Sequence, residues 1–442
     1  MPVSIAIVGA GPSGFYAAAA LVKLDFDCQV DIIESLPTPF GLIRAGVAPD
    51  HQSTKGVSRS FTRTALDSRV RYYGNVRVGR DVALEDLRRI YDAVVLAVGA
   101  PLDRGLEVPG GDRAGVYGSA EFVGWYNGHP EYRDLDPDLN TAAVAVIGNG
   151  NVAIDVARVL VKTPAEMATS DLPDYAARAI HAAPIEAVYL IGRRGPVEAK
   201  FTNKELTEMG ELADCAPVVD PAQLPAAVTG EMSDRDRRLK EKNLATLRTF
   251  AEAPADQKRK RLHFVFFAKP VAVLGDDRVE ALRLERTRVE DGRAVGTGEA
   301  FEIRCGAVVA AIGYRMDGFA GVPIDERSGF VRCRNGRVDR GLYVVGWAKR
   351  GPIGVIGTNK ADGDLVAEHI RADVPHGGKP GRAALERLLD KCGRRWVSFQ
   401  DWQRIDAVEV AAAPAGAPRR KLIRIKDMLA VLDEDIAGAT KT

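Results

Sequence analysis

Three glycines, Gly9, Gly11 and Gly14, have the spacing of a turn that binds the pyrophosphate of a dinucleotide. They follow a short apolar segment, residues 4–8, and precede an Ala-rich stretch, residues 12–24, so the turn connects an expected strand to an expected helix. The first glycine permits the tight turn, and the second lets backbone N–H groups approach phosphates at the positive helix end. The third allows the helix to pack closely on the strand.

An acidic residue completes this first pattern. Glu34 comes 20 residues after Gly14, at the end of the next expected strand, residues 30–34. A carboxylate at this place accepts hydrogen bonds from the hydroxyl groups of an adenosine ribose. The beginning of the chain therefore predicts a βαβ unit that binds the adenosine half of a dinucleotide.

A second turn of the same kind occupies residues 148–153, with the sequence Gly-Asn-Gly-Asn-Val-Ala. It lies between an expected strand that begins at Ala142 and an expected helix over residues 152–162. Alanine replaces the third glycine, which is a known variant of the dinucleotide turn. We therefore expect Asn149, Gly150, Asn151 and Val152 to contact a second dinucleotide.

The strand that follows the second turn ends in two arginines in place of an acid. Arg193 and Arg194 come directly after the expected strand over residues 187–192. A guanidinium group binds a 2′-phosphate that a carboxylate would repel, so this site should prefer NADP to NAD. Arg193 lies 40 residues after Ala153, twice the usual spacing, which requires an insertion around residues 163–183.

Two dinucleotide sites imply two cofactors, a resident FAD at Glu34 and a diffusible NADP(H) at the two arginines. The five cysteines, Cys28, Cys215, Cys305, Cys333 and Cys392, contain no Cys-x-x-Cys pair and no cluster-binding run. Without a redox-active thiol pair, the flavin must pass its electrons to an external acceptor. The histidines show no metal-ligand spacing, and we expect no metal site.

Composition narrows the function classes further. The 442 residues are 46% hydrophobic, enough for two to three compact domains. Lys plus Arg total 61 and Asp plus Glu 60, a net charge of +1 that argues against nucleic-acid binding. The chain opens directly into a strand and has no run of about 18 apolar residues. We expect a cytoplasmic protein without an export signal or a membrane span.

The elements that must position these residues form two halves. Apolar strands over residues 91–99 and 305–313 end in glycine, and each closes one nucleotide-binding half. Between about residues 220 and 304 the apolar residues alternate with period two, which predicts an antiparallel excursion without obvious chemistry of its own. From Gly341 a further strand leads into a glycine-rich segment and a helix from about Ala361. The chain should thus return to its first domain.

We therefore expect an α/β fold with two Rossmann-like dinucleotide-binding domains. The FAD domain is discontinuous and should comprise residues 1–102 and 326–442. The NADP domain, residues 103–325, is inserted between these two parts.

Several long runs make the chain similar to one family. It resembles the adrenodoxin reductase type of ferredoxin–NADP reductase, and in particular the mycobacterial NADPH-ferredoxin reductases. Trp347 stands where other pyridine-nucleotide flavoproteins have an aspartate, as in this family. The similarity covers nearly the whole chain, and the runs that carry it are residues 36–51, 121–130, 148–153, 192–196 and 345–360.

The resemblance implies a set of site residues at matching positions. It places the FAD contacts at Ser13, Glu34, Leu42, Val76, Trp347, Gly354, Val355 and Ile356. It places the NADP contacts at Arg104, Asn149, Gly150, Asn151, Val152, Arg193, Arg194, Glu205 and Gly354. His51 and Glu208 match a pair thought to act beside the flavin, by ordering water or exchanging protons, and are the expected catalytic residues. A helix start at Gly354 would also favour the anionic reduced flavin.

The resemblance also implies the partner, an acidic iron–sulfur ferredoxin, and single-electron transfer to it in either direction. Basic residues in the second half could steer such a partner, although a charged run is more often a solvated face. They are residues 235–242, Arg248 and residues 258–261, with residues 419–421 of the C-terminal tail as a second candidate. We expect a monomer or a weak dimer.

Two other functions stay open at this point. A flavin monooxygenase, or a reductase of a small organic acceptor, would need a substrate pocket for which no motif is evident. A nucleotide-binding redox sensor or structural partner without catalysis would bind FAD that NADPH cannot reduce.

Overall fold

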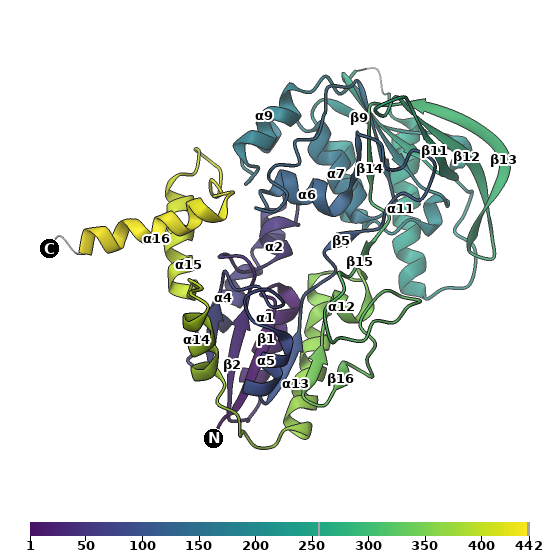
Figure 1. Ribbon diagram of the computed structural model, residues 1–442. Coiled ribbons are helices and arrows are strands. Elements are labelled where there is room, and N and C mark those ends of the chain that lie inside the picture. Colours follow the sequence, from purple (N-terminus) through teal and green to yellow (C-terminus); the bar gives the residue numbers. More distant parts are fainter. Residues whose placement is uncertain (255–256, 440–442) are drawn as a thin grey trace. The chain divides into compact units, whose positions relative to one another are not determined.

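The computed structural model describes residues 1–254 and 257–439, which form two compact units (Figure 1). Unit 1 comprises residues 1–102, 127–130 and 314–442, and unit 2 comprises residues 103–126 and 131–313. The chain thus enters unit 2 after Leu102, returns to unit 1 over residues 127–130, and returns to it again after Gly313. The assignment of FAD to residues 1–102 and 326–442 and of NADP to residues 103–325 stays a prediction.

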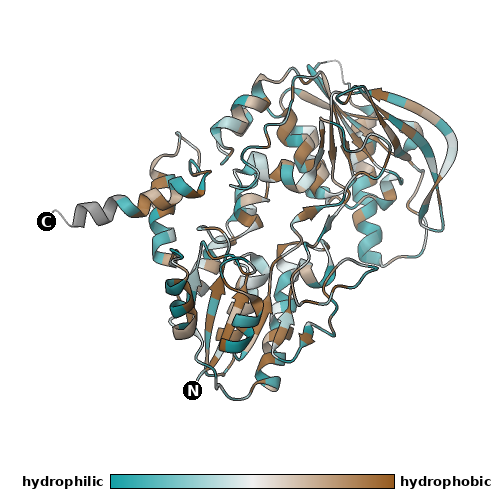
Figure 2. Cartoon of the chain, viewed as in Figure 1, coloured by the Kyte–Doolittle hydropathy of each residue, from teal (hydrophilic) through white to brown (hydrophobic). Residues whose placement is uncertain are grey.

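The main sheet of unit 1 has the strand order β16-β17-β4-β1-β2-β3. Neighbouring strands are parallel, except that β16 is antiparallel to β17. Figure 2 shows apolar residues concentrated on the strands of this sheet, and β1 is buried along its whole length. The strands are β1 (Val3–Val8), β2 (Cys28–Ile33), β3 (Val70–Tyr73), β4 (Ala93–Leu96), β16 (Arg337–Asp339) and β17 (Leu342–Val344).

Helices α1 and α13 pack against each other in unit 1. Small residues allow this close approach, since a Cβ built on Gly363 of α13 would lie 2.8 Å from the backbone nitrogen of Ala17. The helices of this unit are α1 (Pro12–Lys23), α2 (Leu42–Ala45), α3 (Gln52–Lys55), α4 (Ser58–Ala65), α5 (Leu84–Ile90), α12 (Trp347–Arg350), α13 (Asn359–Asp373), α14 (Arg382–Lys391), α15 (Phe399–Ala411) and α16 (Ile425–Ala439).

The main sheet of unit 2 has the order β6-β14-β7-β8-β10-β9, and every neighbouring pair is parallel. Its strands are β6 (Val116–Gly118), β7 (Ala143–Ile147), β8 (Ala187–Ile191), β9 (Cys215–Val219), β10 (Lys260–Val265) and β14 (Ala307–Ala310). The helices are α6 (Ser119–Asn127), α7 (Asn151–Val161), α8 (Pro164–Met167), α9 (Asp174–Ala182), α10 (Asn203–Glu208) and α11 (Asp234–Glu252). The short strands β5 (Leu102–Asp103) and β15 (Tyr314–Arg315) lie where the chain passes between the units.

A separate antiparallel sheet of unit 2 consists of β11 (Ala268–Leu274), β12 (Ala281–Glu290) and β13 (Arg293–Arg304). The antiparallel excursion expected over residues 220–304 is therefore confined to residues 268–304, and the expectation for residues 220–267 was wrong. Helix α11 occupies much of the earlier part, and β10 joins the parallel sheet. The alternation in β10 reflects burial among parallel neighbours, which periodicity alone does not distinguish from antiparallel pairing.

The long spacing between the second glycine turn and the arginines also has a structural explanation. Helices α8 and α9 fill residues 164–182, between α7 and β8. Thr163 caps α8, because its side chain accepts a hydrogen bond from the backbone of Glu166 while the Glu166 carboxylate accepts one from the backbone of Thr163. The insertion leaves the register of β7 and β8 intact, with Ile147 beside Ile191.

Among the described residues, no helix combines the length and the apolar character that a bilayer crossing requires.

Candidate functional site

The first glycine turn, between β1 and α1, has the geometry that the spacing predicts. Gly9 has φ +109°, and a Cβ built on it would lie 2.5 Å from the carbonyl oxygen of Ala97. A Cβ on Gly14 would overlap the carbonyl oxygen of Gly9, so helix and turn touch directly. Around the Cβ position of Gly11, by contrast, no atom of the described residues outside its chain neighbours lies within 4 Å. Gly11 therefore leaves open space at the N-terminus of α1, where a phosphate binds favourably.

Glu34 lies at the end of β2 and contacts the glycine turn. One carboxylate oxygen accepts a hydrogen bond from the backbone of Ala10 at 2.8 Å. The other accepts from the Ser35 hydroxyl at 2.8 Å and from the backbone of Leu36 at 3.2 Å. These bonds fix the carboxylate beside the turn, half-buried, where its remaining lone pairs suit a ribose hydroxyl.

The side chains of the other expected FAD contacts near this turn differ in how deeply they are buried. Leu42, at the start of α2, is 47% exposed. Val76 has its side chain buried in the core, and its backbone N–H donates to the carbonyl of Glu34 at 2.8 Å. Ser13 is buried, and a Cβ on Gly346 would lie 2.6 Å from its hydroxyl oxygen. Val76 could therefore reach a ligand only through its backbone.

A buried carboxylate holds the glycine-rich segment after β17, which contains Trp347 and Gly354. Asp362 of α13 accepts a hydrogen bond from the backbone of Gly346 at 3.1 Å. The same carboxylate pairs with Lys349 at 2.8 Å and with Arg350. Sequence reasoning missed Asp362, because an aspartate in a helix four residues after Thr358 gives no distinctive signal. Its three contacts make it the anchor of this segment.

The segment held by Asp362 presents apolar groups and glycine to solvent. Ile353 is 65% exposed and Val355 is 63% exposed, with Gly354 between them at φ +90°. Trp347 stacks on Tyr314, with ring centroids 5.7 Å apart and an interplanar angle of 20°. Ile356 begins a short 3₁₀ turn that leads into α13. An exposed apolar surface of this kind, beside a helix start, suits a flat aromatic ligand.

The second glycine turn, between β7 and α7, repeats the first. Gly148 has φ +146°, and a Cβ on it would overlap the carbonyl oxygen of Ala311. Apart from its chain neighbours, no described atom lies within 4 Å of the Cβ position of Gly150. Two hydrogen bonds join this turn to residues 200–202. The backbone N–H of Lys200 donates to the Asn149 carbonyl, and the backbone N–H of Thr202 donates to the Asn151 side chain. Gly150, the N-cap of α7, and Val152 in its first turn thus lie at an open helix N-terminus.

The two arginines after β8 form a turn that the antiparallel sheet supports. Arg193 is exposed, and its carbonyl accepts a hydrogen bond from the Thr287 hydroxyl at 2.8 Å. The Arg194 carbonyl accepts from the backbone of Phe267 at 3.2 Å, and its guanidinium donates to the carbonyl of Gly292 at 3.3 Å. The antiparallel sheet, expected to have no chemistry of its own, therefore supports the turn of the predicted phosphate-binding arginines.

A buried arginine gathers three carboxylates of unit 2. Arg158 of α7 is fully buried, and its Nη1 lies 2.8 Å from Asp155 Oδ1. The same nitrogen lies 3.3 Å from Glu205 Oε2 and 3.6 Å from Glu208 Oε2. The structure thus brings the expected NADP contact Glu205 and the expected catalytic Glu208 together on α10. Neither Arg158 nor Asp155 was a sequence-predicted site residue, since both lie inside an ordinary amphipathic helix pattern.

Two further predicted residues are His51 and Arg104. His51 belongs to unit 1, is buried, and precedes α3, whose residue Thr54 donates its backbone N–H to the His51 carbonyl at 3.1 Å. Glu208 belongs to unit 2, and the action of the two residues as a pair stays a prediction. Arg104 is exposed, and its backbone N–H donates to Gly313 at 3.0 Å.

Many of the basic residues expected to steer a partner have structural contacts. Arg237 and Lys240 of α11 donate to backbone carbonyls, as does Arg248. Arg259 pairs with Asp214, and Lys258 donates to Leu212. Three cations of α11, Arg235, Arg238 and Lys242, remain exposed and flank Leu239, which is 47% exposed.

The basic tail is not an exposed patch, which corrects that interpretation. Lys421 is buried and donates to the carbonyls of Arg44 and Asn127, each at 3.0 Å. Arg419 pairs with Asp406 and Glu409. These contacts fix the segment that joins α15 to α16, so two of its three cations serve unit 1 itself.

The five cysteines are free thiols, and three of them are buried. Burial raises the pKa of Cys28 to about 11 and the pKa values of Cys215 and Cys305 to about 12. A thiol must ionise before it attacks a disulphide. These three thiols are therefore not nucleophiles at neutral pH.

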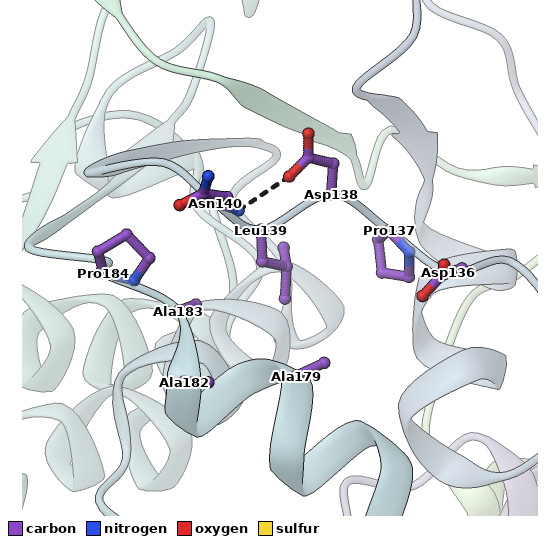
Figure 3. Close-up of a pocket in the computed structure, with 9 residues that line it drawn as sticks. All are labelled: Asp136, Pro137, Asp138, Leu139, Asn140, Ala179, Ala182, Ala183 and Pro184. Carbon is purple, nitrogen blue, oxygen red and sulfur yellow. Dashed lines mark hydrogen bonds between the residues drawn. The ribbon is translucent and has the colours of Figure 1, made fainter.

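Unit 2 also has a pocket of about 390 Å³ between residues 136–140 and the C-terminal end of α9 (Figure 3). Asp138 accepts a hydrogen bond from the backbone of Asn140 at 3.0 Å there, and it pairs with Arg278 at 2.8 Å. None of the residues that line this pocket is a predicted dinucleotide contact.

Comparison with known proteins agrees with the two glycine turns. The model of the pyridine nucleotide-disulphide oxidoreductase family matches residues 3–209. The chain is 40% identical to the NADPH-ferredoxin reductase FprA of Mycobacterium tuberculosis, over 97% of this chain and 99% of that protein. It is 41% identical to the mitochondrial NADPH:adrenodoxin oxidoreductase of Homo sapiens, over 97% of this chain and 91% of that protein.

A solved structure, Mycobacterium tuberculosis FprA in complex with NADPH, matches with a TM-score of 0.93 and 40% identity. The match covers 98% of this chain and 99% of that one. It confirms the α/β fold with two Rossmann-like domains. The similarities also confirm the resemblance that the sequence runs indicated: the chain is an oxidoreductase and belongs to the family of the NADPH-ferredoxin reductases and NADPH:adrenodoxin oxidoreductases.

Proposed function

We propose that this protein is an NADPH-ferredoxin reductase that holds FAD in unit 1 and binds NADP(H) in unit 2. One observation carries the proposal. The chain has two open glycine turns at helix N-termini, one with Glu34 beside it and the other followed by Arg193 and Arg194. The names of the similar proteins, with NADPH as hydride donor and ferredoxin or adrenodoxin as partner, support the same activity.

The residues of unit 1 fit FAD. The open Cβ position of Gly11 leaves room for a pyrophosphate, and Glu34 is fixed where a ribose would lie. Ile353 and Val355 are large apolar side chains left in solvent on the segment that Asp362 anchors. A bound isoalloxazine ring would cover them. When bound, FAD supplies the ability to take two electrons as a hydride and to release them singly.

The residues of unit 2 fit a phosphorylated dinucleotide. Asn149, Gly150, Asn151 and Val152 form the turn for its pyrophosphate, and Arg193 and Arg194 present two guanidinium groups for its 2′-phosphate. Arg158 holds the carboxylates of Glu205 and Glu208 in place. These two carboxylates would orient the nicotinamide end, and Glu208 with His51 would hold or exchange a proton through ordered water.

The partner in this proposal is an acidic iron–sulfur protein separate from this chain. Arg235, Arg238 and Lys242 lie within four residues of the exposed Leu239 on α11, which offers cations and an apolar contact to such a partner. The free thiols are consistent with a reducing compartment, and we propose the cytoplasm.

Anaerobic stopped-flow absorbance of the yellow protein tests this function. The protein is mixed with NADPH or NADH, and then with an oxidised bacterial ferredoxin. We expect fast bleaching of the flavin by NADPH, slower bleaching by NADH, and reoxidation by ferredoxin in one-electron steps. Electrons that pass only to oxygen or to a small molecule would overturn the reductase function. FAD that NADPH cannot bleach would indicate a sensor or structural protein.

A further inference from the structure

The backbone of the Arg193–Arg194 turn depends on one threonine of the antiparallel sheet. Thr287 of β12 is buried, and its hydroxyl donates to the Arg193 carbonyl at 2.8 Å. Its backbone N–H donates to the carbonyl of Phe267 at 2.8 Å, and the Phe267 N–H donates to the Arg194 carbonyl at 3.2 Å. Thr287 therefore reaches both arginines, one directly and the other through Phe267.

A β-bulge brings the hydroxyl of Thr287 to this position. The register between β12 and β13 shifts between Glu285 and Thr287, where the single residue Arg286 of β12 lies opposite residues 297–299 of β13. Upstream of the shift the buried residues of β12 are Leu282 and Leu284, two apart, as a regular strand requires. The next buried residue is Thr287, three positions after Leu284. Had the alternation continued from Leu284, Arg286 would occupy the buried face in place of Thr287.

The chain conformation around this contact is tightly packed. Phe267 has φ +54°, a left-handed conformation that is uncommon outside glycine. A Cβ built on Gly195, directly after the arginines, would lie 2.5 Å from the Phe267 ring. Thr287 thus bonds to the turn through its hydroxyl and to the left-handed Phe267 through its backbone N–H.

We propose that Thr287 is a positioning residue for coenzyme specificity, which fixes the Arg193–Arg194 turn so that both guanidinium groups face a 2′-phosphate. The inference rests on the proposed NADP site of unit 2 and assigns its selectivity partly to the β11–β13 sheet. Loss of the hydroxyl leaves the Arg193 carbonyl without its buried donor, so the turn relaxes and the two cations lose their common orientation. Ligands without a 2′-phosphate should not sense this change.

Calorimetric titration of the FAD-loaded protein with 2′,5′-ADP and with 5′-AMP tests the proposal. Thr287→Val removes the donor at nearly constant volume and should raise the Kd for 2′,5′-ADP about tenfold, with the Kd for 5′-AMP unchanged. Thr287→Ser keeps the donor and should restore tight binding. Thr249→Val is the matched control, since the exposed Thr249 also donates its hydroxyl to a backbone carbonyl, that of Ala245 at 3.2 Å.

The outcomes of these titrations separate the role of Thr287 from the existence of the NADP site. Unchanged 2′,5′-ADP binding by Thr287→Val, or an equal loss for both ligands, would overturn the positioning role. If Thr287→Val yields no folded protein, Thr287→Ala removes the same hydroxyl without added bulk, and the same selective loss is required of it. Wild-type protein that binds 2′,5′-ADP no more tightly than 5′-AMP would refute the proposed NADP site itself, and the role of Thr287 with it.

Discussion

The side-chain amide of Asn149 lies directly against Gly192, so closely that a Cβ built on Gly192 would overlap it. The second glycine turn therefore packs on the end of β8 as well as on α7. This contact links the residues for the pyrophosphate to the arginines that follow Gly192. Sequence spacing identifies Asn149 and the arginines separately, but it does not reveal that Asn149 packs against Gly192, the residue directly before the arginines.

Gly192→Ala should displace Asn149 and weaken NADPH binding about tenfold, with the FAD content unchanged. It should also lower the melting temperature, since the overlap is present without ligand. Gly150→Ala is the contrasting variant, because its added methyl group meets open space in the free protein. It should weaken NADPH binding and leave the melting temperature unchanged. Equal melting temperatures for both variants would contradict this prediction.

Replacement of Arg193 and Arg194 by alanine should raise the KM for NADPH by about a hundredfold, while the KM for NADH stays nearly constant. Both guanidinium groups would bind the 2′-phosphate, which NADH lacks. Steady-state reduction of ferricyanide with each coenzyme measures the two constants. Arg259→Ala, a change at an exposed arginine of the same unit, serves as the control. An equal increase in both constants would disprove the assignment of the arginines.

The sequence was sufficient for the parts of the fold that repeat a local pattern. The strand, glycine turn and helix recur at residues 3–23 and 143–161, because backbone geometry at Gly9 and Gly148 has to be left-handed. It was not sufficient for long-range contacts. Thr287 reaches Arg193 across 94 residues, and Asp362 supports a segment on a different element, which no local spacing records.

Charge runs were the weakest guide. The arginines and lysines of α11 and of residues 419–421 look alike in sequence, yet Lys421 is buried while Arg235 is exposed. Whether such a cation is buried depends on a nearby carbonyl or carboxylate that can accept its hydrogen bonds, and the sequence does not show where these acceptors lie. Periodicity failed for a similar reason over residues 220–304, where parallel burial and antiparallel pairing give the same alternation.

Asp362→Asn should weaken FAD binding about tenfold, because the segment around Gly354 loses the charge that pairs with Lys349 and Arg350. The two cations stay near the segment without a counter-charge, and the backbone of Gly346 keeps only a neutral acceptor. Fluorescence of released FAD on dilution and heating measures the effect. Asp364→Asn, at an exposed position of the same helix, is the control. Identical FAD release by both variants would show that Asp362 does not anchor the segment.

Glu409 predicts a pH dependence of the stability of unit 1. Its side chain is fully buried, and burial alone would raise its pKa. The Arg44 guanidinium beside it and the bond from the backbone of Leu422 at 2.7 Å instead hold the pKa of this carboxyl below its ordinary value. A depressed pKa means that the unfolded state binds the proton more readily than the folded state. The stabilisation is therefore present above the ordinary glutamate pKa of about 4.3 and is lost as the pH falls through the folded value.

Glu409→Gln should lower the free energy of unfolding by about 3 kcal/mol at pH 7, since it leaves Arg44 without its buried counter-charge. The difference from wild type should shrink as the pH falls below about 4, because the wild-type carboxyl then also loses its charge. Urea unfolding at several pH values from about 7 to about 2.5 measures both effects. Glu368→Gln, which breaks the exposed pair with Arg371, should cost less than about 0.5 kcal/mol. A difference for Glu409→Gln that stays constant across this range would show that the buried ion pair is not the origin of the stability.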